Sequence, residues 1–326
     1  TMAGGDFDCD GNWDLAVGAP DDNGGKGKVY IYLGGALNGF PAAPFKIFSG
    51  TVAGGNYGAR VMGLSNFDGD SSGCSDLAVV ASHGGSNKAR VYVYLGKKGL
   101  SDRDDVSAAI GADLVYQLAS GASSAEVLGA TLSDAGDFDG DGASDLAVSY
   151  TNNLIDSASV FVVYGDKTLT PKKSKPPVVK QLPGSAGVQI TGGALTDGFA
   201  TALACGGKLD TTSTTTDTYS DLLIGARDTK LSGSTAGAAY VVKGGARATT
   251  LPETITLGST TRVATIQGGT SNGALGTAVA FVGDMDGDGT PEFAVSDPTV
   301  SSNTGEVYVY NLTGTSTKLR ATIKND

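Results

Sequence analysis

Acidic residues recur at a fixed spacing in this chain of 326 residues. Three segments, which begin at Asp6, Asp137 and Asp284, follow the pattern Asp-x-Asp-x-Asp-Gly-x-x-Asp or Glu. Four carboxylates within nine residues repel one another unless a positive charge lies between them. A hard cation that prefers oxygen ligands removes this repulsion, and Ca²⁺ is the first choice. A solvated turn explains one such segment equally well, but several copies in the same register favour metal binding.

We number five loops by this pattern. Loops 1, 3 and 5 span residues 6–14, 137–145 and 284–292, and loop 2 is a stretched copy at residues 66–76. Loop 4, at residues 208–221, has largely lost the pattern. Positions 1, 3, 5 and 9 offer side-chain oxygens, position 7 offers a backbone carbonyl, and the Gly at position 6 permits a sharp turn. The expected ligands in about four calcium sites are Asp6, Asp8, Asp10, Asn12, Asp14, Asn66, Asp68, Asp70, Asp76, Asp137, Asp139, Asp141, Ala143, Asp145, Asp284, Asp286, Asp288, Thr290 and Glu292.

Loop 4 carries Lys208 where the other loops have their first ligand. A Thr-rich insert also separates Asp210 from Asp217 and Asp221. The Lys208 ammonium can replace the charge of a cation, so we expect no calcium in loop 4. Position 2 is apolar in every loop, and we expect it to anchor the loop in the core; the residues are Phe7, Phe67, Phe138, Leu209 and Met285.

The loops sit inside a repeated unit, because their first positions are 60 to 76 residues apart. Each loop is followed by a short apolar run and then by an alternating run rich in Val, Tyr and Phe, as at residues 29–32, 91–94 and 307–310. Runs of this composition, bounded by Gly, Ser and Asn, are typical of β-strands. Four strands per repeat describe one blade of a β-propeller. The predicted fold is therefore all-β, a single β-propeller domain over residues 1–326 built from four-stranded antiparallel blades.

The repeat resembles a known family. An apolar-Gly pair such as Tyr57-Gly58, an Asp-rich loop and then Gly18-Ala19-Pro20 look like the FG-GAP repeat of integrin α-subunit propellers. Other copies depart mildly from the last motif, as in Ser296-Asp297-Pro298. The resemblance covers essentially the whole chain. It implies a propeller fold, calcium in the loops between the first two strands of each blade, and a role shared by adhesion receptors, lectins and accessory domains of enzymes.

Five loops predict about five blades, with seven as the alternative if sequence is missing upstream. The chain begins after the point where the first strand of blade one is expected, and its last strand, near residues 318–323, matches an outer strand. We therefore expect about one inner strand to be missing. Upstream residues or another chain would have to supply it, since an unpaired edge invites aggregation.

The formal charge of −11 is concentrated in the loops, and four bound Ca²⁺ would reduce it to about −3. This acidity argues against a nucleic-acid partner. No apolar run is long enough to span a membrane. Cys9, Cys74 and Cys205 form no zinc motif. Unpaired thiols are the simpler interpretation, and a Cys9–Cys74 disulfide between neighbouring loops is the alternative.

The function expected from the sequence is recognition or adhesion. We expect a secreted or cell-surface protein that binds a protein or glycan partner, with calcium stabilising the blades. The open alternatives are a structural unit of an extracellular assembly, including self-assembly, and the non-catalytic propeller of a secreted hydrolase. No catalytic motif appears, and His83 is the only histidine, so we expect no enzyme activity. Candidate binding loops are residues 34–45, 97–113, 165–181 and 227–237, the third of which holds a basic patch at residues 172–175.

Overall fold

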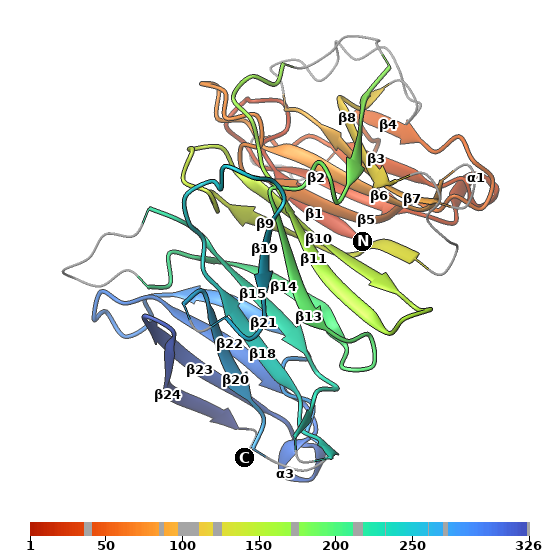
Figure 1. Ribbon diagram of the computed structural model, residues 1–326. Coiled ribbons are helices and arrows are strands. Elements are labelled where there is room, and N and C mark those ends of the chain that lie inside the picture. The colour runs from red at the N-terminus through yellow and green to blue at the C-terminus, as the bar shows by residue number, and fades with distance from the viewer. Residues whose placement is uncertain are drawn as a thin grey trace. The chain divides into compact units, whose positions relative to one another are not determined.

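The computed structural model describes most of the chain (Figure 1). The described residues are 1–35, 41–84, 88–96, 111–119, 126–170, 176–210, 218–231, 233–259, 261–269 and 273–324. Within them the protein is almost entirely β, and the two helices are single turns, α1 (Asp22–Gly25) and α3 (Val300–Asn303). Neither is long and apolar enough to cross a membrane.

In each of five sheets, four strands pair side by side in their order along the chain. The first is β1 (Met2–Gly5), β2 (Asp14–Ala19), β3 (Lys28–Tyr32) and β4 (Lys46–Ser49). The second is β5 (Tyr57–Leu64), β6 (Asp76–Gly84), β7 (Lys88–Tyr94) and β8 (Leu114–Leu118). The third is β9 (Glu126–Gly136), β10 (Asp145–Asn152), β11 (Ser157–Val163) and β13 (Val188–Gly193). The fourth is β14 (Phe199–Gly207), β15 (Asp221–Ala226), β18 (Ala238–Val242) and β20 (Val263–Gln267). The fifth is β21 (Val279–Gly283), β22 (Glu292–Asp297), β23 (Glu306–Thr313) and β24 (Ser316–Lys324).

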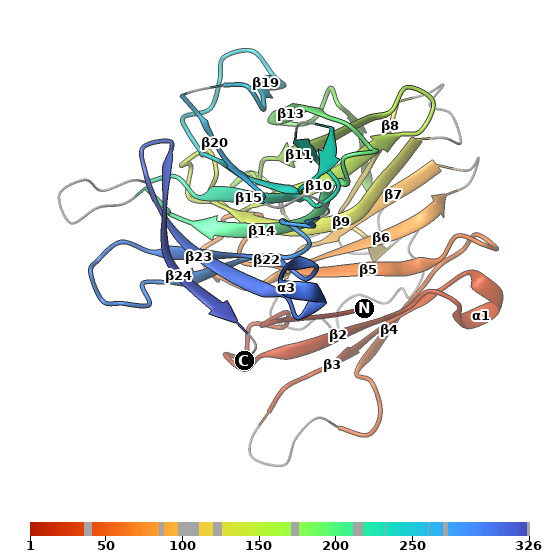
Figure 2. The ribbon, with the colours of Figure 1, turned by 90° about the horizontal axis from the view of Figure 1, so that it is seen from below.

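The repeated antiparallel sheet confirms the all-β, propeller-like fold predicted from the sequence. Each acidic loop joins the first strand of its sheet to the second, as from β21 to β22. Figure 2 shows β22, β23 and β24 of the fifth sheet side by side. The apolar run after each loop becomes the second strand, whose described residues are all buried or half-buried. All six residues of β15, for example, are buried. The alternating run becomes the third strand.

Two sheets carry a fifth strand that the sequence did not predict. β12 (Val178–Leu182) pairs parallel with β8, and β19 (Glu253–Thr256) pairs parallel with β13. Each added strand lies in the segment after the third strand of one sheet and joins the outer strand of the sheet before it. Part of the candidate binding loop 165–181 is therefore a strand. A short hairpin of β16 (Lys230–Leu231) and β17 (Ser234–Thr235) occupies part of the loop 227–237.

Contacts divide the chain into two compact units. Unit 1 comprises Thr1–Asp134, Gly142–Val148 and Val163–Ala186, and unit 2 comprises Ala135–Asp141, Ser149–Val162 and Gly187–Asp326. Each has its own apolar core. The core of unit 1 includes Phe7, Phe48 and Tyr57, and that of unit 2 includes Leu209 and Phe293. The expectation of one domain over residues 1–326 stays a prediction.

The expectation of a missing inner strand in the first blade is wrong. β1 pairs antiparallel with β2 from Met2↔Val17 to Gly5↔Asp14. The four residues Met2–Gly5 are enough for this strand, because they pair with the first four residues of β2. The basic patch at residues 172–175 lies outside the described residues.

The simpler interpretation of the cysteines is also wrong for one pair. Cys9 and Cys74 form a disulfide with a Cα–Cα distance of 5.1 Å, and Cys205 is a free thiol. The bond joins loop 1 to loop 2 within unit 1. The backbone beside it reinforces the link, since the Asp6 N–H donates to Ser75 Oγ at 3.1 Å and the Ser75 N–H donates to the Asp6 carbonyl at 2.9 Å.

Candidate metal centres

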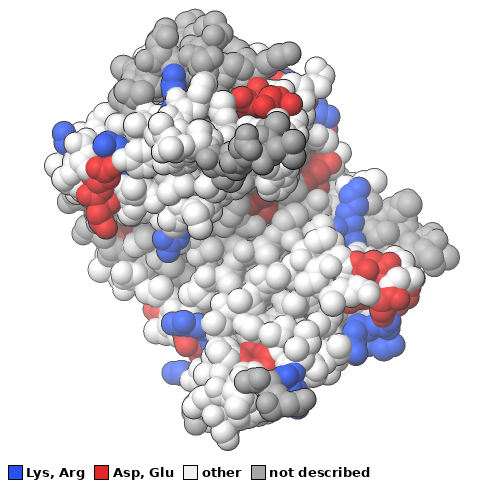
Figure 3. Space-filling view, turned by 180° about the vertical axis from the view of Figure 1, so that it is seen from behind, with Lys and Arg blue, Asp and Glu red and all other residues white. Residues whose placement is uncertain are grey.

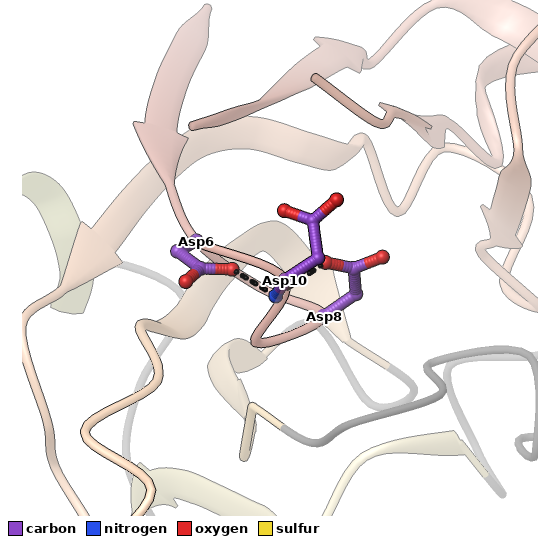
Figure 4. Close-up of side chains that lie close together, drawn as sticks. All are labelled: Asp6, Asp8 and Asp10. Carbon is purple, nitrogen blue, oxygen red and sulfur yellow. Dashed lines mark hydrogen bonds between the residues drawn. The ribbon is translucent and has the colours of Figure 1, made fainter. Parts of the chain in front are cut away.

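Loop 1 gathers three carboxylates around one point. Asp6, Asp8 and Asp10 each have an oxygen within 4.8 Å of the others, and Figure 4 shows the three side chains around a tight turn. The backbone N–H of Asp10 donates to Asp6 Oδ1 at 3.1 Å and to Asp8 Oδ1 at 3.2 Å (Figure 4). The Gly11 N–H donates to Asp6 Oδ2 at 3.0 Å. The turn therefore holds positions 1 and 3 close together before any cation binds.

Loops 3 and 5 also bring acidic side chains together. The groups are Asp137 with Asp139 and Asp141, and Asp284 with Asp286 and Glu292. Loop 5 repeats the internal contacts of loop 1, because the Gly289 N–H donates to Asp284 Oδ2 at 3.0 Å and the Asp288 N–H donates to Asp286 Oδ1 at 3.2 Å. The same local sequence thus builds the same turn.

Loop 2 holds its carboxylates more deeply. Asp68 is 2 % exposed, and its Oδ2 has no hydrogen-bond partner. Asn66 Oδ1 is likewise buried without a partner, while its Nδ2 donates to the Asp70 carbonyl at 3.0 Å. Two buried acceptor oxygens without a donor are costly in a folded protein. A bound cation would satisfy both.

Loop 5 contains a similar buried acceptor. Glu292 is 1 % exposed, and its Oε1 has no hydrogen-bond partner although its Oε2 accepts the Met285 N–H at 2.8 Å. Glu292 belongs to the acidic group of this loop, so its unsatisfied oxygen is a candidate ligand for a cation. The oxygen donors of loops 2 and 5 therefore fit a hard divalent ion.

Carboxylates at position 3 are electrostatically unfavourable without a cation. Burial, with Asp10 beside it, raises the pKa of the Asp8 carboxyl. Burial also raises the pKa of Asp68, and the charges of Asp70 and Asp113 add to the shift although a backbone N–H opposes it. Asp113 comes from the segment just before β8, and the sequence gave no reason to associate it with loop 2. A cation would relieve the repulsion in both loops.

The carboxylate at position 9 has a structural role in addition to its expected role as a calcium ligand. Asp14 Oδ2 accepts the Phe7 N–H at 2.8 Å, and its Oδ1 accepts the Gly34 N–H at 2.9 Å. The position-9 carboxylate thereby ties its own loop to the end of the third strand. The corresponding donors are Phe67 and Gly96 for Asp76, Gly165 for Asp145, and Leu209 and Gly244 for Asp221.

The burial of these carboxylates is nearly complete, with 2 % or less of each residue exposed. Burial raises the pKa of Asp76 to about 7, although the backbone donors favour the charged form. Loop 4 keeps this contact at Asp221 even though the rest of its pattern is lost. The contact therefore does not depend on the acidic pattern that a cation requires.

The glycine in this contact cannot be replaced by a larger residue. A Cβ at Gly34 would lie 2.1 Å from the Trp13 carbonyl oxygen, and a Cβ at Gly165 would lie 2.3 Å from that of Ser144. The glycine follows the position-9 carboxylate by 20 residues in the first three sheets and by 23 in the fourth. This recurring spacing is present in the sequence but was not part of the predicted site.

Arginine side chains contact two of the loops. Arg247 Nε donates to Asp139 Oδ2 at 2.6 Å, and its Nη2 donates to Asp141 Oδ2 at 3.0 Å. Arg320 Nη2 donates to Asp286 Oδ2 and, at 2.8 Å, to Asp288 Oδ2. Each arginine thus forms ion pairs with the carboxylates at positions 3 and 5 of its loop. On the side opposite to that seen in Figure 1, Figure 3 shows groups of acidic side chains with basic ones beside them.

The arginines change the electrostatics of the position-3 carboxylates. Hydrogen bonding by Arg320 lowers the pKa of Asp286. Burial raises the pKa of Asp139, and Arg247 opposes that shift. Within the described part of the chain, no basic side chain lies within ion-pair distance of the carboxylates of loops 1 and 2. Sequence reasoning missed both arginines because each lies far from its loop in the chain.

In loop 4 a lysine pairs with a carboxylate, but this lysine is Lys243 and not the expected Lys208. Lys243 Nζ forms a salt bridge with Asp210 Oδ2, the position-3 carboxylate. Both side chains are largely buried, at 20 % and 14 % exposure. Lys243 immediately precedes the recurring turn at Gly244, at the position where the first two sheets have Leu33 and Leu95. The absence of calcium from loop 4 stays a prediction, and Lys243 now supports it. Asp217 lies outside the described residues.

The remaining expected residues are placed as follows. Position 2 is buried in loops 1 to 4, as expected, but Met285 is 62 % exposed, so the expected anchoring is wrong for loop 5. The Asn12 N–H donates to Asp10 Oδ1 at 2.7 Å, and the Thr290 N–H donates to Asp288 Oδ1 at 2.9 Å. Ala143 is fully buried. The side chain of His83 lies outside the described part of the structure.

Comparison with known families agrees with the repeat. The FG-GAP repeat family matches residues 275–310, which include Leu275-Gly276, loop 5 and the start of β23. No curated protein matches the chain significantly. The matched segment contains the acidic group of Asp284, Asp286 and Glu292. The chain therefore contains an FG-GAP repeat, and the other four sheets repeat its strand order.

Proposed function

We propose that this FG-GAP repeat protein is an extracellular recognition or adhesion module whose blades are stabilised by calcium. Loops 1, 2, 3 and 5 would hold the ions, and loop 4 would rely on the Lys243–Asp210 pair. A protein or glycan would be the partner. The proposal assigns no catalytic step to the chain. Bound Ca²⁺ would supply positive charge and link the oxygens of each loop.

The buried acceptors of loops 2 and 5 carry this proposal. Asp68 Oδ2 and Glu292 Oε1 are buried, lack a hydrogen-bond donor and belong to oxygen-rich loops. Leaving such an oxygen unsatisfied costs about 1–3 kcal/mol, and more when it is charged. A cation that binds the folded loop removes this cost. Binding therefore favours the folded state.

An extracellular location is supported by two features. Loops of this kind in extracellular modules bind calcium with dissociation constants of roughly 10⁻⁴–10⁻³ M, which suits calcium concentrations outside the cell. The Cys9–Cys74 disulfide is also typical of oxidising compartments. Both features favour secretion or display at the cell surface.

A protein partner is favoured over a glycan by one exposed side chain. Trp13 is the only tryptophan, lies in loop 1 and is 74 % exposed. Exposed tryptophans are enriched among the residues that dominate protein interfaces. Met2, in the strand that pairs with β2, is 71 % exposed. A sugar platform usually needs several aromatic rings, and Trp13 is the only large aromatic ring in this loop beside the buried Phe7.

Thermal unfolding in calcium and in chelator tests the calcium part of the proposal. At 5 mM Ca²⁺ and a dissociation constant near 10⁻⁴ M, each site stabilises the fold by about 2 kcal/mol. Several sites together should raise the melting temperature by about 10 °C or more. Mg²⁺ at the same concentration is the control for ionic strength. Equal melting temperatures in calcium and chelator would contradict the proposal.

Trp13 also reports loop 1 directly. Its fluorescence should change during a calcium titration, because it lies between positions 7 and 9 of that loop. The double substitution Asp8→Asn with Asp10→Asn should abolish the change. Asp228→Asn is a matched control, since Asp228 is an exposed carboxylate outside the loops. Loss of the signal in the control variant would show that the change is not specific to loop 1.

A further inference from the structure

Two loops that are alike in sequence differ in the charge beside them. Loop 5 and loop 1 share the acids at positions 1, 3 and 5 and the glycine at position 6. In loop 5, Arg320 contacts both Asp286 and Asp288. In loop 1, among the described residues, the equivalent Asp8 and Asp10 have no basic partner. The guanidinium is therefore a charge difference between two loops that have the same acids at these positions.

The backbone of β24 directs Arg320 toward the loop. β24 pairs with β23 through Val309↔Ala321 and Tyr310↔Leu319, so Arg320 is an extra residue at an irregularity in the pairing. A β-bulge of this kind redirects a side chain. The Arg320 side chain is 26 % exposed, and the residue as a whole is exposed like most of β24. The contact with loop 5 is therefore built into the strand.

The arginine and a calcium ion would compete for the same atoms. Calcium in loop 5 would need oxygens of Asp286 and Asp288 at about 2.3–2.6 Å. The guanidinium already donates hydrogen bonds to Oδ2 of both side chains. Two cations that share these oxygens would repel each other strongly at that separation. Calcium binding therefore requires the guanidinium to move away.

Loop 5 nevertheless keeps the features of a metal site. Arg320 does not satisfy Glu292 Oε1, which stays buried without a hydrogen-bond partner. Loop 4 is different, because Lys208 replaces its first ligand and Lys243 pairs with Asp210. Loop 5 has lost no ligand. Its arginine is an added competitor in a complete site.

We propose that Arg320 is a tethered cation that competes with calcium at loop 5 and sets the affinity of that loop below the affinity of loop 1. Arg247 has the same role at loop 3, where it contacts positions 3 and 5. At low calcium the arginines hold loops 3 and 5 in place, whereas the described residues provide no such substitute for loops 1 and 2. The inference rests on the proposed calcium binding and adds that the sites differ in calcium affinity.

Two reporter proteins separate the loops. The native chain reports loop 1 through Trp13. The double substitution Trp13→Phe with Met285→Trp moves the tryptophan to position 2 of loop 5, where the 62 % exposed Met285 leaves room for it. The Met285 contact with Glu292 uses the backbone N–H, so the new side chain does not remove it. Each protein is titrated with Ca²⁺ alone.

Arg320→Gln should raise the calcium affinity of the loop 5 reporter by about tenfold, because the competing charge is gone. The same substitution should leave the loop 1 reporter unchanged. Arg320→Lys keeps a positive charge and should stay close to the unsubstituted reporter. Arg227→Gln is the matched control, since Arg227 pairs with Asp228 on the surface and touches no loop.

The outcomes distinguish this inference from the proposed function. If loop 1 binds calcium and Arg320→Gln leaves loop 5 unchanged or weakens it, Arg320 is an ordinary surface ion pair and the inference is wrong. If neither reporter responds to calcium, the proposed function itself fails. A second readout covers a variant that folds poorly. The calcium-dependent rise in melting temperature should be larger for Arg320→Gln than for Arg320→Lys, and an equal rise would also overturn the inference.

Discussion

Cys9 and Cys74 form a disulfide that joins loop 1 to loop 2 across 65 residues of sequence. Cys9 occupies position 4 of its loop with φ of +66°. Loops 2, 3 and 5 have glycine at this position, also with positive φ; the residues are Gly69, Gly140 and Gly287. A side chain in this conformation costs about 1 kcal/mol. Loop 1 accepts that cost and gains the cross-link.

Removing the disulfide should destabilise the protein by about 4 kcal/mol, the chain-entropy value for a closed loop of this length. The glycine variant, Cys9→Gly with Cys74→Ser, should recover about 1 kcal/mol relative to Cys9→Ala with Cys74→Ser. Denaturant unfolding of both variants beside the native protein measures the two differences. Equal stability of the two variants would mean that the positive φ of Cys9 carries no cost.

The position-9 carboxylate of loop 4 should stabilise the fold equally with and without calcium. Asp221→Ala removes the acceptor for the Leu209 and Gly244 N–H groups in a fully buried setting. We expect a loss of about 2–4 kcal/mol, because two buried donors lose a charged acceptor. The loss should be the same in calcium and in chelator, as measured by calorimetry.

Asp8→Ala provides the contrast for this prediction. Asp8 makes its contacts within loop 1 and would act mainly as a ligand. Its substitution should lower the melting temperature in calcium and leave it nearly unchanged in chelator. A calcium-independent loss for Asp8→Ala, or a calcium-dependent one for Asp221→Ala, would contradict the division of roles between these positions.

The Lys243–Asp210 pair should replace the cation in loop 4. Lys243→Leu restores the residue type of the first two sheets but leaves Asp210 without this cation in a largely buried position. We expect a loss of about 1–3 kcal/mol. Adding Asp210→Asn should return much of the stability, because the neutral amide needs no counter-charge. Urea unfolding of the single and double variants measures the recovery, and an absence of recovery would show that the lysine acts through packing.

Glu306 should contribute a stability that depends on pH. Hydrogen bonds from Ser301, Lys324 and Tyr308 lower the pKa of its carboxyl to about 2. Because the pKa is lower in the folded protein than the usual value near 4.3, the contribution is complete above that value and is lost as the pH falls toward 2. Glu306→Gln should remove it.

Unfolding midpoints measured between pH 5 and pH 2 check this prediction. The native protein should lose stability more steeply over that range than Glu306→Gln does. Parallel curves would show that Glu306 has the same pKa in the folded and unfolded states. Calcium is removed from every sample beforehand by dialysis against chelator at neutral pH, so that calcium release from the loops adds no second pH dependence.

Local patterns in the sequence were enough for most of the strands and for the acidic loops. Alternation of apolar residues predicted strands such as β3 and β23, because the two faces of a strand differ in burial. The spacing of the acids predicted the groups in loops 1, 3 and 5, because all their ligands lie within nine residues. The Gly at position 6 has positive φ in each of these loops, as the turn requires; the residues are Gly11, Gly142 and Gly289.

The sequence by itself determined the repeat, the all-β fold and the chemistry of the loops, because each depends on residues that are close in the chain. The tertiary structure decided which charges those loops contact. Arg247 reaches Asp139 across 108 residues and Arg320 reaches Asp286 across 34, while Lys243 rather than Lys208 pairs with Asp210. Such pairings depend on how strands from distant parts of the chain are placed, and no local spacing encodes that placement.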